Sequence, residues 1–266
     1  MQIESQDQTT KEAPAADESV NGLDGDFRVT NKVAALLQRI AENNYASANE
    51  IGVMFNSIGY KYRVINGLLK LGFIRSLNTH IQPSKVYYLT DLAHGYLASK
   101  GLSRVDDKFQ ENNYRITTCI HTLYCLSVRL VMERIDGVQN WKPERVLNYQ
   151  VKRISRMVDA EFDMGESHFG LEVEITLKSP KVLKGNILKL RARRDLNNIL
   201  WVITSKGIFE AVRRSYEMKD DLKGVLSDEQ NRHLFVMYND LMENRLDAKV
   251  FNLNEKTVEL KALVGK

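Results

Sequence analysis

The chain has 266 residues, 43% hydrophobic and 27% charged, a composition typical of a soluble globular protein with one large or two modest domains. No apolar stretch has the length of a membrane span and no signal sequence opens the chain, so we expect a cytoplasmic protein without a membrane span. The two cysteines, Cys119 and Cys125, do not form a Cys-x-x-Cys pair, and we interpret them as buried thiols.

Charge is unevenly distributed along the chain. Residues 1–26 contain seven acidic residues and one basic residue, a net charge of −6. Because the whole chain carries +4, residues 27–266 carry +10. A basic body favours a polyanionic partner, although an ordinary solvated basic surface is an open alternative. The polar, acidic residues 1–27 are predicted to be a disordered leader.

Residues 28–100 show helical periodicity first and strand patterns later. Val33, Leu36, Leu37 and Ile40, for example, have the spacing of one helix face. The predicted elements are a helix after the N-cap Thr30, a helix after Ser47, a helix over 59–71 that ends before Gly72, strands at 73–75 and 86–89, and a helix over 91–100.

This order resembles a winged helix-turn-helix, and the segment Tyr62–Ile74 resembles its recognition helix and first wing strand. The exposed face of the third helix, together with the loop between the strands, carries side chains suited to DNA phosphates and base edges. The candidate DNA-binding residues here are Lys61, Arg63, Asn66, Lys70 and Lys85. A winged helix used only for dimerisation is the alternative, and a homodimer is left open.

A polar linker at 101–113 is expected to lead into a second domain over 114–266. Strands that alternate with helices predict a mixed sheet with packed helices, and therefore an α+β or α/β fold. The predicted elements are a helix over 114–135, a short helix from Trp141 to Leu147 with Pro143 near its start, strands near 153–163 and 168–177, a helix over 180–197, a strand at 199–204, a helix over 207–216, a strand at 233–238 and a terminal hairpin within 248–263.

The segment from Gly170 to Lys178 places two carboxylates, Glu172 and Glu174, two residues apart in an apolar run. In a strand these two would share one face with Thr176 and Lys178, while Leu171, Val173, Ile175 and Leu177 would enter a core. Neighbouring carboxylates repel each other unless a cation lies between them. Asp159 lies a hairpin's length upstream, so the sequence predicts a divalent-metal site of Asp159, Glu172 and Glu174. A surface hairpin with solvated glutamates is the alternative.

Val158-Asp159 followed by Glu172-Val173-Glu174 resembles the PD-(D/E)xK motif of restriction-endonuclease-like folds. The proline of that motif is absent, and Glu174 stands where its lysine is usual. The resemblance implies Mg²⁺ or Mn²⁺ held by Asp159 and Glu172, with Glu174 orienting a water or holding a second ion. Lys178 is a distant substitute for the missing lysine, and Glu144 is a candidate further acid.

A basic segment follows this strand and is expected to hold a DNA backbone beside the ions. A solvated helix face is the alternative. Its candidate DNA-binding residues are Lys181, Lys184, Lys189 and Arg193. The five histidines are scattered along the chain, and His121 is interpreted as a packed core residue rather than a ligand.

A winged helix joined to a Glu-x-Glu domain is similar to the MobC class of plasmid mobilisation relaxases and the replication-relaxation proteins. The similarity rests on the His121 helix, Trp141–Glu144, Val158-Asp159 and the Glu172–Lys178 run. It implies site-specific nicking of double-stranded DNA at an origin of transfer, with an accessory mobilisation protein and a type IV secretion coupling protein as partners. The alternatives are a non-catalytic DNA-binding regulator or relaxosome accessory protein, and a restriction-like or transposon-end endonuclease.

Overall fold

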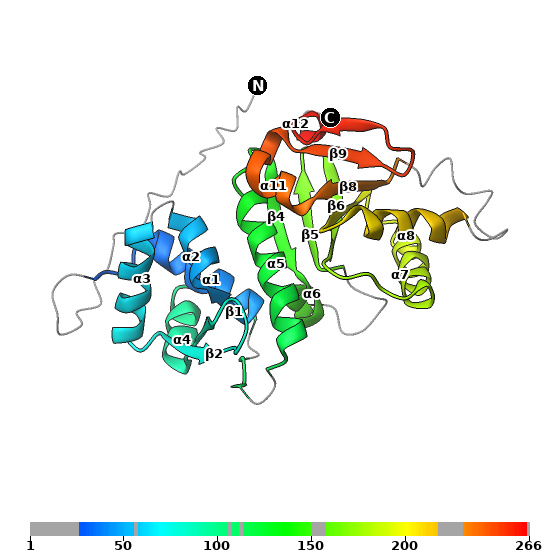
Figure 1. Cartoon of the computed structure of the whole chain (residues 1–266). Coiled ribbons are helices and arrows are strands. Elements are labelled where there is room, and N and C mark those ends of the chain that lie inside the picture. The colour runs from blue at the N-terminus through cyan, green and yellow to red at the C-terminus, as the bar shows by residue number, and fades with distance from the viewer. Residues whose placement is uncertain are drawn as a thin grey trace, which may run out of the picture.

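The structure, a computed structural model, describes residues 27–55, 58–105, 108–111, 114–150, 158–217 and 231–264. The predicted leader lies outside these residues, apart from Phe27. The N-terminal part combines helices with a small sheet (Figure 1). Its elements are α1 (Asn31–Asn43), β1 (Tyr45–Ser47), α2 (Ala48–Phe55), α3 (Ile58–Lys70), β2 (Ile74–Asn78), β3 (Lys85–Leu89) and α4 (Asp91–Ser99).

Local sequence signals explain where these helices begin and end. Thr30 caps α1 by accepting a hydrogen bond from the backbone N–H of Val33. Ser47 and Glu50 form a capping box at α2, because the Glu50 carboxylate accepts the Ser47 backbone N–H at 2.9 Å. Gly72, with a φ of 68°, ends the turn after α3 in the left-handed region that glycine adopts at low cost. The predicted caps at Thr30 and Ser47 and the helix end before Gly72 are therefore confirmed, whereas the helix predicted over 91–100 ends at Ser99.

The small sheet has three antiparallel strands in the order β1-β3-β2. A buried apolar cluster joins it to the helices, with Leu37 of α1, Ile51 of α2, Leu68 of α3 and Leu97 of α4 among its members. Burial of these faces drives the packing. The helix α3 buries one face in this cluster and leaves its other face exposed to solvent.

The C-terminal part is built on a larger sheet of seven strands in the order β10-β9-β8-β7-β6-β5-β4. The pairs β6–β7 and β7–β8 are parallel and the other pairs are antiparallel, so the predicted mixed α+β architecture is confirmed. Its elements are α5 (Ile116–Met132), β4 (Val138–Pro143), α6 (Glu144–Gln150), β5 (Ala160–Met164), β6 (Ser167–Glu174), α7 (Pro180–Ala192), β7 (Asn198–Ile203), α8 (Lys206–Glu217), β8 (His233–Met237), α11 (Tyr238–Asn244), a 3-10 turn (Arg245–Asp247), β9 (Lys249–Asn252), β10 (Thr257–Glu259) and α12 (Lys261–Val264).

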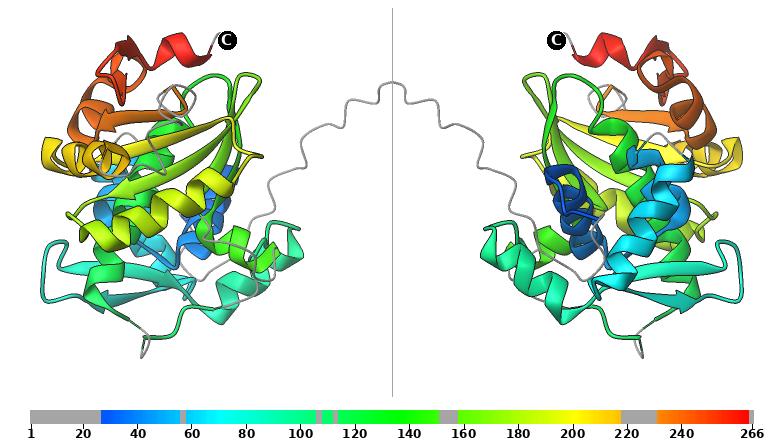
Figure 2. Two further views of the ribbon diagram at one scale, coloured as in Figure 1. Left: turned by 90° about the vertical axis from the view of Figure 1, so that its right-hand side faces the viewer. Right: turned by 90° about the vertical axis from the view of Figure 1, so that its left-hand side faces the viewer.

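Helices cover both faces of the seven-stranded sheet (Figures 1 and 2). On one face, Leu171 and Val173 of β6 join an apolar cluster that contains Val128 and Val131 of α5 and Leu241 of α11. On the other face, a second cluster holds Trp201 and Ile203 of β7 with Leu183 and Ile187 of α7 and Phe209 of α8. The central strands β6, β7 and β8 are therefore buried on both sides, as is typical of parallel strands.

The helix α5 lies between the two parts of the molecule (Figure 1). Leu126 and Leu130 belong to the apolar cluster of the N-terminal part, whereas Val128 and Val131 belong to that of the large sheet. Buried ion pairs reinforce the first of these contacts. The side chain of Arg129 lies 2.7 Å from Glu42 of α1 and 2.8 Å from Glu133 at the end of α5, and only 4% of it is exposed.

Several predicted boundaries were wrong. The strand predicted over 168–177 ends at Glu174, and Leu177, expected in a core, is 64% exposed. Trp141 to Pro143 belong to the strand β4 rather than to a helix, because their backbone pairs with β5. The predicted helix over 180–197 ends at Ala192. The terminal hairpin is confirmed, whereas the strand predicted from residue 153 lies partly outside the described residues, which resume at Val158.

The predicted domain boundaries at 27, 100 and 113 stay predictions. In the part of the chain that the structure describes, no helix combines the length and apolar character required to cross a bilayer.

Candidate functional site

Glu172 and Glu174 lie inside the molecule. In the parallel register of β6 with β7, Glu172 is opposite Trp201 and Glu174 is opposite Ile203. Registered residues of neighbouring strands share a face, so both carboxylates point to the side covered by α7 and α8. Glu172 is 0% exposed and Glu174 is 3% exposed. Burial of a carboxylate is costly unless it is paired, so the alternative of solvated glutamates is excluded.

Because β6 ends at Glu174, Lys178 does not lie further along the same strand. The chain leaves the strand after Glu174, and the Lys178 ammonium returns to form an ion pair with the Glu174 carboxylate. The sequence prediction placed these two residues far apart along a continuous strand, and that placement was wrong. Lys178 lies beside the carboxylate strand as its counter-ion. This pairing partly offsets the cost of burying Glu174.

Asp159 is held in the bend before β5. Its backbone N–H donates to the Leu171 carbonyl at 2.9 Å, and its carbonyl accepts the Glu144 backbone N–H at 2.8 Å. Its carboxylate accepts the Val173 backbone N–H through Oδ2 at 2.7 Å. These three bonds tie the bend to both β6 and the first residue of α6. The Asp159 side chain is therefore positioned by backbone geometry rather than by rotamer preference alone.

The side chain that meets the Asp159 carboxylate comes from α5. The Nε2 atom of His121 lies 3.4 Å from Asp159 Oδ2 and 3.0 Å from the Val173 carbonyl oxygen. Cys125, one turn further along α5, places its Sγ 3.8 Å from His121 Nδ1. Among the described residues, His121, Cys125 and Asp159 form the group whose candidate ligand atoms all lie within 4.8 Å of one another, and Glu172 and Glu174 are not part of it.

A cavity of about 130 Å³ opens beside this group. Glu144, the exposed first residue of α6, lines the cavity together with His121, Cys125 and Asp159. Asn44, after the end of α1, also lines it, so the cavity lies where the N-terminal part meets the large sheet. The structure thus brings two predicted residues, Asp159 and Glu144, to one cavity.

Electrostatics within this group favour a charged imidazole. Burial opposes protonation of His121, but the hydrogen bonds to Asp159 and Cys125 outweigh it and raise the pKa of His121 to about 12. Burial and the nearby Asp159 carboxylate raise the pKa of the Cys125 thiol to about 12. Without a bound cation, the group therefore holds a protonated imidazole beside a carboxylate and a neutral thiol.

Sequence reasoning did not find this group. The sequence predicts His121 as a packed core residue and Cys125 as a buried thiol, and the structure places both next to Asp159. One signal was present: a histidine and a cysteine four residues apart share a helix face. That signal alone does not show which part of the sheet the face meets.

The predicted DNA-binding residues of α3 lie on its outer face. Arg63, Asn66 and Lys70 are exposed, Lys61 is half-buried, and Lys85 is exposed at the start of β3. The ammonium of Lys61 lies over the ring of Tyr62, 5.0 Å from its centroid. The structure therefore presents these cations on one helix and the adjacent hairpin.

The basic residues around α7 differ in exposure. Lys181 and Lys189 are exposed and Lys184 is half-buried. Arg193, after the end of α7, is bound within the fold, because its guanidinium lies 2.6 Å from Glu161 and 2.5 Å from Asp195. Its charge is largely compensated, so Arg193 is a weaker candidate for a phosphate contact than the lysines.

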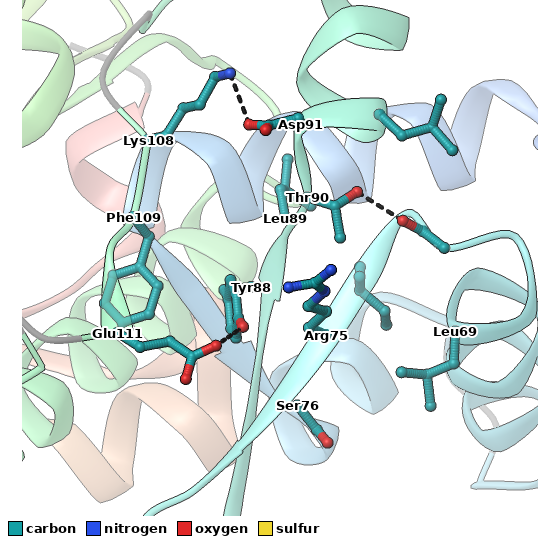
Figure 3. A pocket seen from close by; sticks show the side chains of 13 residues that line it. Leu69, Arg75, Ser76, Tyr88, Leu89, Thr90, Asp91, Lys108, Phe109 and Glu111 are labelled. Atoms are coloured by element: carbon teal, nitrogen blue, oxygen red, sulfur yellow. Dashed lines mark hydrogen bonds and ion pairs between the residues drawn. The ribbon is translucent and has the colours of Figure 1, made fainter.

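A larger cavity of about 1070 Å³ lies along β2 and the start of α4, and Figure 3 shows its lining. Its charged groups pair with neighbours: Lys108 lies 2.6 Å from Asp91, and Tyr88 donates a hydrogen bond to Glu111. Arg75 points into the space between them (Figure 3). The cavity is open and shares no lining residue with the one beside Asp159.

Comparison with known protein families, with curated proteins and with solved structures gave no match to this chain.

Proposed function

We propose that the protein binds double-stranded DNA through α3 and the β2–β3 hairpin. The observation that carries the proposal is the outer face of α3, where Arg63, Asn66 and Lys70 are exposed beside a buried apolar face. An exposed helix with cationic and amide side chains suits the major groove, because such groups bind phosphates and base edges.

The arrangement of the N-terminal part supports this proposal. Its order of helix, short strand, two helices and a two-stranded hairpin resembles that of a winged helix-turn-helix. In this interpretation α3 is the recognition helix and Lys85, at the start of β3, belongs to the wing. The net charge of +10 over residues 27–266 adds a long-range attraction to DNA.

A selection experiment tests this function. The full chain is incubated with duplexes of randomised sequence, bound DNA is recovered and amplified, and affinity for the enriched sequence is measured over a range of salt concentrations. We expect one enriched motif and an affinity that falls steeply as salt rises, because cationic contacts release counterions. Absence of any salt-sensitive binding would refute the proposal. Binding without an enriched motif would show that the protein binds DNA without sequence specificity.

A metal-dependent endonuclease in the large sheet is the second candidate. The meander β4–β5–β6, followed by α7 and the parallel strand β7, favours it because this order resembles that of PD-(D/E)xK folds. The buried carboxylates of Glu172 and Glu174 on β6 also favour it. In the MobC-like form of this candidate, the product is a nick at an origin of transfer, made with the accessory and coupling proteins of mobilisation.

The described geometry does not fit one Mg²⁺ or Mn²⁺ ion held by all three predicted carboxylates. Mg²⁺ requires closely placed oxygen ligands. Glu172 and Glu174 face α7 and α8, whereas the Asp159 carboxylate faces His121 of α5. A non-catalytic DNA-binding regulator is therefore the direct competitor of this candidate, and the ion pair of Glu174 with Lys178 favours that competitor.

Plasmid cleavage separates these candidates. Supercoiled plasmid carrying the selected motif is incubated with the protein and Mg²⁺ or Mn²⁺, and then with Glu172→Gln and Glu174→Gln variants. Open circles that both variants fail to produce support a nicking enzyme, whereas linear product supports a restriction-like or transposon-end enzyme. If the preparation binds the motif but the plasmid stays intact, the endonuclease candidate is rejected and the non-catalytic regulator is supported. Lys249→Gln, at an exposed position on β9, is the matched control.

A further inference from the structure

His121 and Cys125 are placed as a pair by α5. Residues four apart on a helix point the same way, and here the imidazole Nδ1 and the thiol Sγ are 3.8 Å apart. Asp159 approaches from the bend before β5, with its Oδ2 atom 3.4 Å from His121 Nε2. Three side chains of different donor chemistry thus converge from two separate segments, and all three are partly buried.

The backbone of β6 orients two of these side chains. The Val173 carbonyl lies 3.0 Å from His121 Nε2, and the Val173 N–H donates to Asp159 Oδ2 at 2.7 Å. The Cys125 Sγ atom lies 3.8 Å from His121 Nδ1 and 3.9 Å from His121 Nε2, so the thiol is near both ring nitrogens. The Asp159 carboxylate lies beside Nε2, so Nε2 is the nitrogen that is close to both other side chains. Outer hydrogen bonds such as the one from the Val173 N–H to Asp159 commonly orient metal ligands.

The separations suit a tetrahedral ion. Zinc bonds of about 2.0–2.1 Å to nitrogen and about 2.3 Å to sulfur place those two ligand atoms about 3.6 Å apart at a tetrahedral angle. The observed distances of Cys125 Sγ from His121 Nδ1 and Nε2 are 3.8 Å and 3.9 Å, both close to this value. The adjacent cavity of about 130 Å³ has room for a water molecule as a fourth ligand, and Glu144 also lines it.

The donor set selects the class of ion. Imidazole nitrogen and thiolate sulfur prefer borderline transition metals, whereas Mg²⁺ and Ca²⁺ prefer oxygen ligands. We propose that His121, Cys125 and Asp159 form a site for a divalent transition metal of the Zn²⁺ class, distinct from the carboxylate pair on β6. Binding displaces the proton of the Cys125 thiol and any proton on the His121 nitrogen that ligates the metal, and these protons pass to solvent. The inference does not depend on DNA binding or on cleavage.

Cobalt titration tests the site because a thiolate ligand gives Co²⁺ a charge-transfer absorption band. The full chain, stripped of metal with a chelator, is titrated with Co²⁺ and then with Zn²⁺. We expect a band that saturates at one Co²⁺ per chain, disappears on addition of Zn²⁺ and survives an excess of Mg²⁺. No charge-transfer band in the wild-type protein would overturn the proposal.

The two cysteines of the chain provide a matched pair of variants. Cys125→Ser is expected to abolish the band, whereas Cys119→Ser, buried in the apolar cluster with Tyr45, should keep it. His121→Gln and Asp159→Asn should weaken Co²⁺ affinity at least about tenfold. A band that persists in Cys125→Ser would overturn the proposal.

A measurement on the wild-type protein tests the site even if the variants do not fold. Labelling of Cys125 by a thiol reagent, located by mass spectrometry, should slow at least about tenfold when Zn²⁺ is bound, since a bound thiolate is no longer free to react. Equal labelling rates with and without Zn²⁺ would refute coordination by Cys125.

Discussion

The N-terminal part and the large sheet differ in the exposure of their charged side chains. The charged side chains of α3 stand on an exposed face, outside an apolar cluster. On β6, two carboxylates are buried between a sheet and its covering helices. Exposed cations cost little and act on a partner, whereas buried carboxylates cost stability and require partners within the fold.

This contrast shows which functional hypothesis each part supports. An exposed cationic helix face is ready for a polyanion without any change in the fold. Buried carboxylates such as Glu172 and Glu174 can act in catalysis only if substrate and ions reach them. The cavity beside Asp159 is lined by His121 and Cys125 instead of these two glutamates. The DNA-binding proposal is therefore the stronger, and the nuclease candidate depends on access to β6.

The largest expected effect comes from the buried charges that join the two parts. Arg129→Met leaves the Glu42 carboxylate, which is 1% exposed, with Arg104 at 3.3 Å as a cation and the Gln38 amide at 2.9 Å as a donor. We expect a loss of about 3 kcal/mol in unfolding free energy, measured by urea denaturation. The double variant Arg129→Met/Glu42→Gln removes both charges and should recover most of this loss. Equal stability of wild type and Arg129→Met would contradict the prediction.

An intermediate effect is expected on DNA affinity. Arg63→Ala/Lys70→Ala removes two cations from the α3 face, so the slope of log affinity against log salt should fall in magnitude by about 1.8, with affinity reduced at least about tenfold. Fluorescence anisotropy with a labelled duplex measures both quantities. Lys249→Ala/Lys256→Ala removes two exposed lysines near the terminal hairpin and controls for net charge. A similar loss in the control would show that binding follows total charge rather than α3.

The smallest effect concerns pH and the metal-free His121 group. The folded-state pKa of His121, about 12, exceeds the ordinary histidine pKa of 6.5, so the folded state retains a proton that the unfolded state loses. The resulting stabilisation is fully present below pH 6.5 and declines as pH rises towards 12. Between about pH 6.5 and 7.5, the stability advantage of wild type over His121→Gln should shrink by roughly 1 kcal/mol in the presence of chelator.

Urea denaturation at several pH values measures this difference. His80→Gln, in the exposed loop between β2 and β3, is the control and should show no comparable change. A wild-type advantage that grows with pH would show that the imidazole is neutral in the folded state.

Much of the fold was predictable because it follows from local signals. The apolar spacing of α1, the Thr30 cap and Gly72 after α3 each act within a few residues. The strand β1 was missed because its three residues carry no alternation of their own and become a strand by pairing with β3. A pairing partner forty residues away leaves no local signal.

The candidate site was predictable only in part, for the same reason. The sequence shows that Glu172 and Glu174 share a face, but β7 and α7 determine that the face is buried. Asp159 was singled out correctly as a residue near the hairpin, yet its carboxylate meets α5 rather than β6 side chains. The contact between His121 and Asp159 joins residues far apart in the chain, and local sequence spacing does not predict such contacts.

The shared helix α5 has a consequence for how the molecule unfolds. Its residues Leu126 and Leu130 serve one apolar cluster, and Val128 and Val131 serve another. Separating the two parts would expose apolar residues of α5 that are buried against one of them, so local opening of one part weakens the other. Hydrogen exchange should therefore find the α5 amides among the slowest in the chain, and both parts should exchange as one cooperative unit.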